Sequence, residues 1–483
     1  MEVRGAPLRF FSASILSAVL ATVFLLVTAT PAQQPSSPGQ PIPGTNGSSP
    51  FSGSVPDKLT PGVLPLSLRD AIDRGLKHNL GALLSSTDIG AARGQRWQQL
   101  SSLLPHVIAN PFIDESKTNL GELGLTSLGG IKLPSSVGPF SYFDARVQVN
   151  QSLFDWKSIN NTRASDQSLK SAEFSYKNAR DLVVLAVGYT YLEGIADEAR
   201  IETAEAQVKT AQALYDQAAD QVTAGTSPAI DGLRAKVELQ TRQQQLIQAR
   251  NNFAIQKLTV SRVIGLAPGQ EFEFTDKSPY QPFDAITLGD ALKQAYDSRP
   301  DYRAAATDVR AAEFSRKAAS AGYLPSLSFG LDYGAAGAHP STTSDVFDIR
   351  GTLAIPIFQG GQVHGDVLQA QARLDQSRER LEDLRAQIDA DVRTALLNIQ
   401  SSAEQVAVAR SNIDLAEQTL AQSRDRFTAG VTDTVEVVQS QEAVASAHEQ
   451  YITSLYNYNF AKISLARALG LAENGVKAYF KGL

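Results

Sequence analysis

The feature that most constrains this chain is a helical segment far longer than a globular domain needs. Residues 360–427 contain no proline, and apolar or small side chains recur there at steps of three and four residues, as in the seam of a coiled coil. At a rise of about 1.5 Å per residue, such a helix is about 100 Å long. Residues 157–222 show the same character. We therefore expect two very long helices.

Each long helix meets an Ala-Gly pair, at 224–225 and 429–430, and a second helical pattern follows. Glycine just past a helix end permits the left-handed conformation that closes the helix, and Pro228 suits the start of the next helix. The pattern predicts two helical hairpins, at about 157–265 and 360–470. A glycine kink inside one continuous helix is the alternative, and the proline after the first pair argues against it.

The two halves of the chain resemble each other block by block. Residues 67–107 align without gaps with 287–327, the tip sequence AGTSPAID matches AGVTDTVE, and RVIGLA matches RALGLA. Chance similarity between helical sequences is the alternative, but three matched blocks in the same order favour a tandem duplication. The structural repeats are then residues 66–285 and 286–483.

Between the first helices and the long helix of each half, the periodicity changes to two. SYFDARVQVNQSLF and FDIRGTLAIPIF alternate apolar and polar residues, which is typical of amphipathic strands. We expect β-hairpins at about 106–154 and 326–358, and aromatic residues flank the first of them, as at a membrane interface: Phe112, Phe140, Tyr142, Phe154 and Trp156. Hairpins packed on helices in a soluble protein and strands of a membrane barrel explain the alternation equally well.

The N-terminus has the order of a secretory signal. Arg4 and Arg9 precede an uncharged apolar stretch at 10–27, and the small residues around Ala32 suit cleavage. A retained membrane anchor is the alternative, since the apolar stretch reaches the lower limit for a span. Residues 1–32 are thus predicted to be a signal peptide. Residues 33–65 are rich in Pro, Gly and Ser and are predicted to be a disordered leader.

Composition excludes several classes of function. The chain has no cysteine, so disulfides, thiol catalysis and cysteine metal sites are ruled out. A net charge of −6 without a basic stripe gives no case for nucleic-acid binding. The histidines are scattered, and neither a P-loop nor a nucleophile motif is present. We therefore expect no enzyme, cofactor or metal site.

A short helix, a Leu-Pro break, a hairpin, a long helix, Ala-Gly with a returning helix and an RVIGLA-like end all occur twice. In this combination the chain resembles the TolC-like outer membrane efflux protein family over about residues 66–472. The resemblance implies a mainly α protein with a small transmembrane β part. It implies a homotrimer in the cell outer membrane, whose four strands per chain close a twelve-stranded β-barrel in the lipid and whose coiled-coil hairpins form an α-barrel in the periplasm.

The resemblance also implies the function and its partners. Family members are passive exit ducts of tripartite efflux or type I secretion systems, supplied by an inner-membrane pump (RND, ABC or MFS type) and a periplasmic adaptor. The adaptor contact maps onto the hairpin tips, at Ala224, Gly225, Thr226, Ala429, Gly430 and Val431. The lipid contact maps onto the apolar strand faces, at Phe143, Val147, Val149, Leu153, Phe347, Ile349, Leu353 and Ile355.

A periplasmic gate near the tips is the last implied feature. Its candidates are Asp231, Glu436, Gln439 and Phe427. The sequence departs from the family pattern here, since Gln439 replaces an acid, Thr432 stands where a gate-locking arginine can occur, and Phe427 replaces a tyrosine. A solvated charge in the first turn of a helix is the alternative for Glu436, because that turn favours acids.

A different class of protein shares many of these features. A secreted or periplasmic coiled-coil scaffold, or an adhesin-like protein, would also have a signal peptide and long helices. It needs no lipid-facing strands, so the two hypotheses differ in what charged residues on the apolar strand faces would do.

Overall fold

The computed structural model describes residues 49–122, 124, 127–276, 280–283, 286–473 and 475. The predicted signal peptide and the first part of the predicted leader, up to residue 48, lie outside them. Within the described part of the chain, no helix combines the length and the apolar character needed to cross a membrane.

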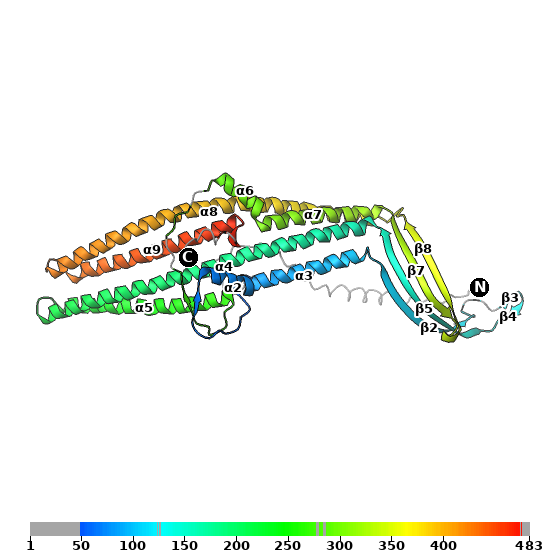
Figure 1. Ribbon diagram of the computed structural model, residues 1–483, viewed down its shortest axis with the longest axis horizontal. Coiled ribbons are helices and arrows are strands. Elements are labelled where there is room, and N and C mark those ends of the chain that lie inside the picture. The colour runs from blue at the N-terminus through cyan, green and yellow to red at the C-terminus, as the bar shows by residue number, and fades with distance from the viewer. Residues whose placement is uncertain are drawn as a thin grey trace, which may run out of the picture. The chain divides into compact units, whose positions relative to one another are not determined.

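The main elements of the two halves follow the same order, with two helices, two long strands, a long helix and a returning helix (Figure 1). The first half contains η1 (Pro50–Ser52), β1 (Leu64–Leu66), α2 (Leu68–His78), α3 (Leu80–Ser101), β2 (His106–Asn119), β3 (Ser127–Leu128), β4 (Ile131–Lys132), β5 (Ser136–Phe154), α4 (Trp156–Thr223), α5 (Ala229–Ile264) and β6 (Phe272–Phe274). The second half contains α6 (Leu288–Ser298), α7 (Pro300–Ser320), η2 (Ala321–Tyr323), β7 (Ser326–Gly337), η3 (Pro340–Thr342), β8 (Thr343–Ala354), α8 (Gln362–Thr428) and α9 (Thr434–Ala468).

Matching caps begin the first helix of each half. Ser67 accepts a hydrogen bond from the Asp70 N–H at 3.1 Å, and Thr287 accepts one from the Asp290 N–H at 3.2 Å. Both hydroxyls satisfy a helix-end donor that would otherwise lack a partner. Later in each half, a Leu-Pro pair separates helix from strand. The similarity of the halves therefore extends to side-chain contacts.

Strands β2, β5, β7 and β8 form one antiparallel sheet in the order β2-β5-β7-β8. Each strand leads into or out of a helix: β2 follows α3, β5 precedes α4, β7 follows α7 and η2, and β8 precedes α8 (Figure 1). Gly360 and Gly361, both with positive φ, form the bend between β8 and α8. Glycine adopts this conformation without the strain of a side chain.

The helices repeat the order of the strands. Next to the sheet, neighbouring helices pack as α3-α4-α7-α8, and toward the tips they pack as α5-α4-α9-α8. Helices α4 and α8 run through both levels, whereas α5 and α9 return from the tips toward the middle (Figure 1). Gly188 lets α4 approach α9, because a Cβ there would lie 2.6 Å from Ile463 Cδ1. The layer of helices thus continues the sheet.

Three apolar cores hold this layer together. One surrounds Tyr191, whose hydroxyl donates to the Leu66 carbonyl at 2.8 Å, and a second surrounds Tyr458. The third joins the two hairpins near their tips and consists of Leu214, Ala218, Ala235, Leu420, Phe427 and Val437. Buried apolar contact therefore reaches almost to the tips.

The predicted disordered leader is wrong for the part that the structure describes. The Val55 N–H donates to the His78 carbonyl and the Asp57 N–H to the Gly265 carbonyl, both at 2.9 Å, while Phe51 packs against the first core. The composition of the leader predicts disorder only for the segment by itself, without contacts to the rest of the chain. The ends of α2 and α5 leave carbonyls without partners within their helices, and those carbonyls, with the adjacent apolar surface, hold the leader in place.

Candidate functional site

The four-stranded sheet has one apolar face. Because residues directly opposite in a sheet point to the same side, Ala109, Val147, Tyr333 and Phe347 share one row across all four strands. The next row of this face contains Val107, Val149, Leu331 and Ile349. Phe347 is 72% exposed and Ile349 64% exposed in the chain by itself. An apolar face this continuous and exposed suits contact with lipid.

Most of the predicted lipid-facing residues lie on this face or close to it. Phe143 and Val149 are half-buried, Val147, Phe347, Ile349 and Leu353 are exposed, and Leu153 lies at a register shift between Ser152 and Phe154. The placement of Ile355 in a strand is wrong. Strand β8 ends at Ala354, because the chain turns there toward α8. Ile355 is still 61% exposed.

The opposite face of the sheet is polar. Gln148, Asp332 and Asp348 share one row, and Arg350 donates to Asp348 at 3.1 Å. In β5, Asp144 forms an ion pair with Arg146 and accepts a hydrogen bond from the Tyr142 hydroxyl at 2.8 Å. A sheet that is apolar on one face and charged on the other separates lipid from water.

The predicted aromatic band at the membrane interface holds only in part. The rings of Phe154 and Trp156 meet edge to face, with centroids 5.3 Å apart, where β5 passes into α4. Phe112, however, lies opposite Asp144, and the Tyr142 hydroxyl bonds to that carboxylate. The register therefore places Phe112 and Tyr142 on the polar face, a parity that proximity in sequence does not reveal.

The sheet is open at both edges. Among the described residues, β2 is hydrogen-bonded to β5 alone and β8 to β7 alone. Each edge strand is 12 residues long or longer, and an edge of this length presents a row of backbone groups that need partners. In lipid such groups must be paired, so the isolated sheet is incomplete as a membrane structure.

The two tips have the same backbone conformation. Gly225 and Gly430 both have φ of 71°, and the residue after each glycine donates its N–H back to the helix, Thr226 to the Gln221 carbonyl and Val431 to the Arg426 carbonyl, both at 2.9 Å. This pattern ends a helix in a Schellman-type turn. The tips are therefore turns between antiparallel helices, as predicted, and not kinks.

Glu436 is held within its own hairpin. Arg426 of α8 lies 3.4 Å from its Oε1, and the Thr432 and Ser423 hydroxyls donate to its carboxylate at 2.5 and 3.4 Å. Sequence reasoning identified Glu436 but missed Arg426 and Ser423. The signal was present, since residues equally distant from a helical tip face each other across the hairpin. Such a clamp fixes a carboxylate beside the tip.

The other gate candidates lie in different surroundings. Gln439 is exposed, whereas Asp231 is buried and faces Arg234 at 3.5 Å. Phe427 is only 5% exposed and packs in the third core. Its assignment to the gate is therefore corrected, because a side chain enclosed between two hairpins stabilises their packing and cannot line a passage.

With these features in place, comparison with known proteins defines the class. Residues 87–266 and 291–471 match the family described as Outer membrane efflux protein. The two matched segments lie within the two structural halves and cover more than half of the chain. The chain therefore belongs to the outer membrane efflux protein family.

Individual relatives agree with this assignment. The chain is 22% identical to the pyoverdine export outer membrane protein OpmQ of Pseudomonas aeruginosa, over 80% of this chain and 83% of that protein. It is 22% identical to the outer membrane protein TolC of Escherichia coli, over 68% and 69%. The Campylobacter jejuni CmeC outer membrane channel matches with a TM-score of 0.75 and 18% identity, over 90% and 94% of the two chains.

The expectation drawn from the TolC-like resemblance is thus confirmed. The protein is an outer-membrane exit channel with a periplasmic helical part. The family is one of transport proteins and not of enzymes. Nothing in these relatives favours the coiled-coil scaffold.

Proposed function

We propose that three copies of this chain close into one duct, which passively conducts substrate delivered by an inner-membrane pump through a periplasmic adaptor. The observation that carries the proposal is that the helices lie side by side in the same order as the strands they connect to. Both the sheet and the layer of helices end in an open edge on the same two sides. Four strands cannot close on themselves, and bacterial membrane barrels begin at about eight. Three copies supply twelve strands.

The edges have the surfaces that such closure requires. Strand β8 of one copy would pair with β2 of the next, satisfying both open edges. In the helical layer, α5 exposes Leu233, Val237 and Leu258. At the other edge, α8 exposes Leu397, Val408 and Leu415. Exposed apolar rows on both edge helices suit burial against a neighbouring copy.

Native mass spectrometry of the particle extracted by detergent from outer membranes tests this closure. We expect a mass of three mature chains, each beginning near Gln33 if the predicted signal peptide is cleaved. Solubilisation in several detergents is the control against aggregates. A monomer as the largest specific species would contradict the proposal.

At the periplasmic end, the tips and the gate have different functions. We assign adaptor contact to the exposed tips at 224–226 and 429–431, where Val431 is 69% exposed. The gate is assigned to Glu436, three copies of which would form an anionic ring near the entrance, with Gln439 exposed on the same helix. Arg426 and Thr432 hold this carboxylate.

Relatives are named for export of pyoverdine, toluene and alkaline protease. We therefore assign the choice of substrate to the partner proteins, and the type of pump is likewise a property of the partners.

Two substitutions near the second tip separate these roles. Glu436→Gln removes one negative charge per copy from the ring at the entrance. The preference of the channel for cations should therefore fall, which is measured as a smaller reversal potential across a salt gradient in planar bilayers. Val431→Glu should leave conductance unchanged and abolish photo-crosslinking of the tip to a periplasmic protein. The reverse assignment of the two effects would contradict the division.

A further inference from the structure

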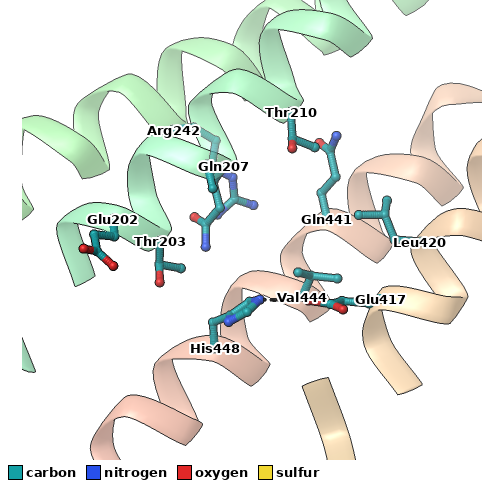
Figure 2. Close-up of a pocket in the computed structure, with 11 residues that line it drawn as sticks. Glu202, Thr203, Gln207, Thr210, Arg242, Glu417, Leu420, Gln441, Val444 and His448 are labelled. Carbon is teal, nitrogen blue, oxygen red and sulfur yellow. Dashed lines mark ion pairs between the residues drawn. The ribbon is translucent and has the colours of Figure 1, made fainter. Parts of the chain in front are cut away.

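A cavity of about 400 Å³ lies between the two helical hairpins (Figure 2). Helix α4 contributes Glu202 and Gln207, α9 contributes Gln441 and His448, and Arg242 reaches it from α5. The cavity is therefore formed by side chains of both hairpins within a single copy. Its volume is in the range of small-molecule sites, and none of the predicted tip, gate or lipid-facing residues lines it.

Gln441 is the unusual group in this cavity. Its side chain extends from α9 toward α4 (Figure 2) and is 6% exposed, and neither Oε1 nor Nε2 has a hydrogen-bond partner among the residues that the structure describes. A buried amide without partners is costly, and few such groups occur in folded proteins. The amide therefore has unused hydrogen-bonding capacity beside the cavity.

The charges around the cavity favour a cation. The guanidinium of Arg242 is neutralised by Glu238, which lies 2.6 Å from its Nε with both side chains buried. Glu202 has no cation within ion-pair distance among the described residues, and Glu417 faces His448 at 3.3 Å. Both carboxylates belong to solvent-exposed residues of the cavity lining, where their negative charges attract a cation and repel an anion.

The lining also decides which cation fits. No group of three possible metal-ligating side chains occurs among the described residues, so the cavity lacks the converging ligands of a divalent metal site. Ala206, Leu420 and Val444 add apolar surface between the polar groups. A ligand must therefore combine hydrogen-bond donors, positive charge and a carbon skeleton.

We propose that this cavity binds a small organic ammonium ion. The ammonium donates to Gln441 Oε1, the carboxylates of Glu202 and Glu417 balance its charge, and its carbon skeleton packs against Leu420 and Val444. Because the ligand touches α4 and α9 together, it links the two hairpins of one copy. The site is complete within one chain and does not depend on how copies assemble.

Calorimetric titration of the purified full-length protein with 2-phenylethylammonium tests the proposal. We expect saturable binding that is at least about tenfold tighter than for 2-phenylethanol, which has the same skeleton without the charge. Phenylacetate should not bind, because the carboxylates repel it. Equal binding of the alcohol and the ammonium would overturn the proposal, as would failure of the ammonium to saturate.

Two variants identify the site. Gln441→Leu keeps the shape of the side chain and removes the amide, so the affinity for the ammonium should fall by about tenfold or more, while resistance to denaturant stays equal or rises. Glu202→Gln should weaken binding and its dependence on salt. Gln405→Leu, on an exposed part of α8, is the matched control and should bind as wild type. Wild-type affinity in Gln441→Leu would place the ligand elsewhere and overturn the assignment.

Discussion

Arginine at both Val147 and Ile349 should abolish assembly in the outer membrane. Both residues lie near the middle of their strands on the apolar face of the sheet, and Ile349 is 64% exposed. A cationic side chain at the lipid midplane costs about 2–4 kcal/mol in a membrane barrel. Six such charges in a trimer would cost about 12–24 kcal/mol, which is comparable to or larger than the stability of about 5–15 kcal/mol of ordinary folded proteins.

The neighbouring residues provide a matched control. Gln148 and Asp348 are next to the substituted residues in sequence but belong to the polar face of the same strands. Arginine at these two positions should leave the trimer in the outer membrane, because water solvates that face. The measurement is the native mass and yield of trimer from outer-membrane fractions. Equal yields for the two double variants would contradict the assignment of a lipid-facing side.

The two-faced sheet was predictable because its signal is local. Alternation in SYFDARVQVNQSLF fixes which residues share a face once a strand forms, and the Ala-Gly pairs fix the tips through backbone conformation alone. Pairing order is different. That β5 lies between β2 and β7 depends on contacts between residues nearly two hundred positions apart, so the local pattern does not reveal it.

The errors have a common physical origin in tertiary contact. The family resemblance assigned Phe427 to the gate, but its surroundings are set by α4 and α5 of the other hairpin. The composition of the leader predicted disorder, but its N–H groups donate to carbonyls at the ends of two helices. Gln441 looks like any solvated glutamine of a coiled coil. Its isolation appears only when four helices enclose it.

The buried charges at the junction of the helices are likewise invisible in the sequence. Arg467 of α9 donates to Asn178 of α4 at 2.9 Å and reaches Asp301 of α7 at 3.4 Å. Arg299 bonds to Asp301 as well. Despite burial, the hydrogen bond from Arg299 and the nearby charge of Arg467 lower the pKa of Asp301 to about 2. Asp301 is therefore a paired, ionised group.

Asp181 of α4 lies in the same cluster but in the opposite situation. It is 5% exposed, and within the described structure its Oδ2 has no hydrogen-bond partner. Burial raises its pKa to about 6, against the opposing charge of Arg467 and a hydrogen bond from the Glu473 backbone N–H. The folded protein thus binds the proton of Asp181 more tightly than the unfolded chain, whose value is near 3.8.

The sign of the resulting pH dependence follows from linkage. Because the folded pKa is raised, the stabilising effect of the bound proton is full below about pH 3.8 and is lost as the pH rises through about 6. A difference of about two pKa units corresponds to about 3 kcal/mol per chain. Asp181→Asn, which is neutral at every pH, should therefore match wild type near pH 4 and be about 3 kcal/mol more stable above pH 6.

Denaturant unfolding of the detergent-solubilised protein between pH 4 and 8 measures this difference in stability. Asp88→Asn, at an exposed position in α3, is the control and should follow wild type throughout.

The opposite outcome is equally informative. If the ionised Asp181 is the partner that Arg467 requires, removing it leaves a buried cation uncompensated, and the variant will be less stable at neutral pH by about 3–5 kcal/mol. Stabilisation would assign the charge of Arg467 to Asp301, and destabilisation would assign it to Asp181. The two carboxylates face the same arginine, so the sign of this one measurement decides which of them joins α9 to the rest of the channel.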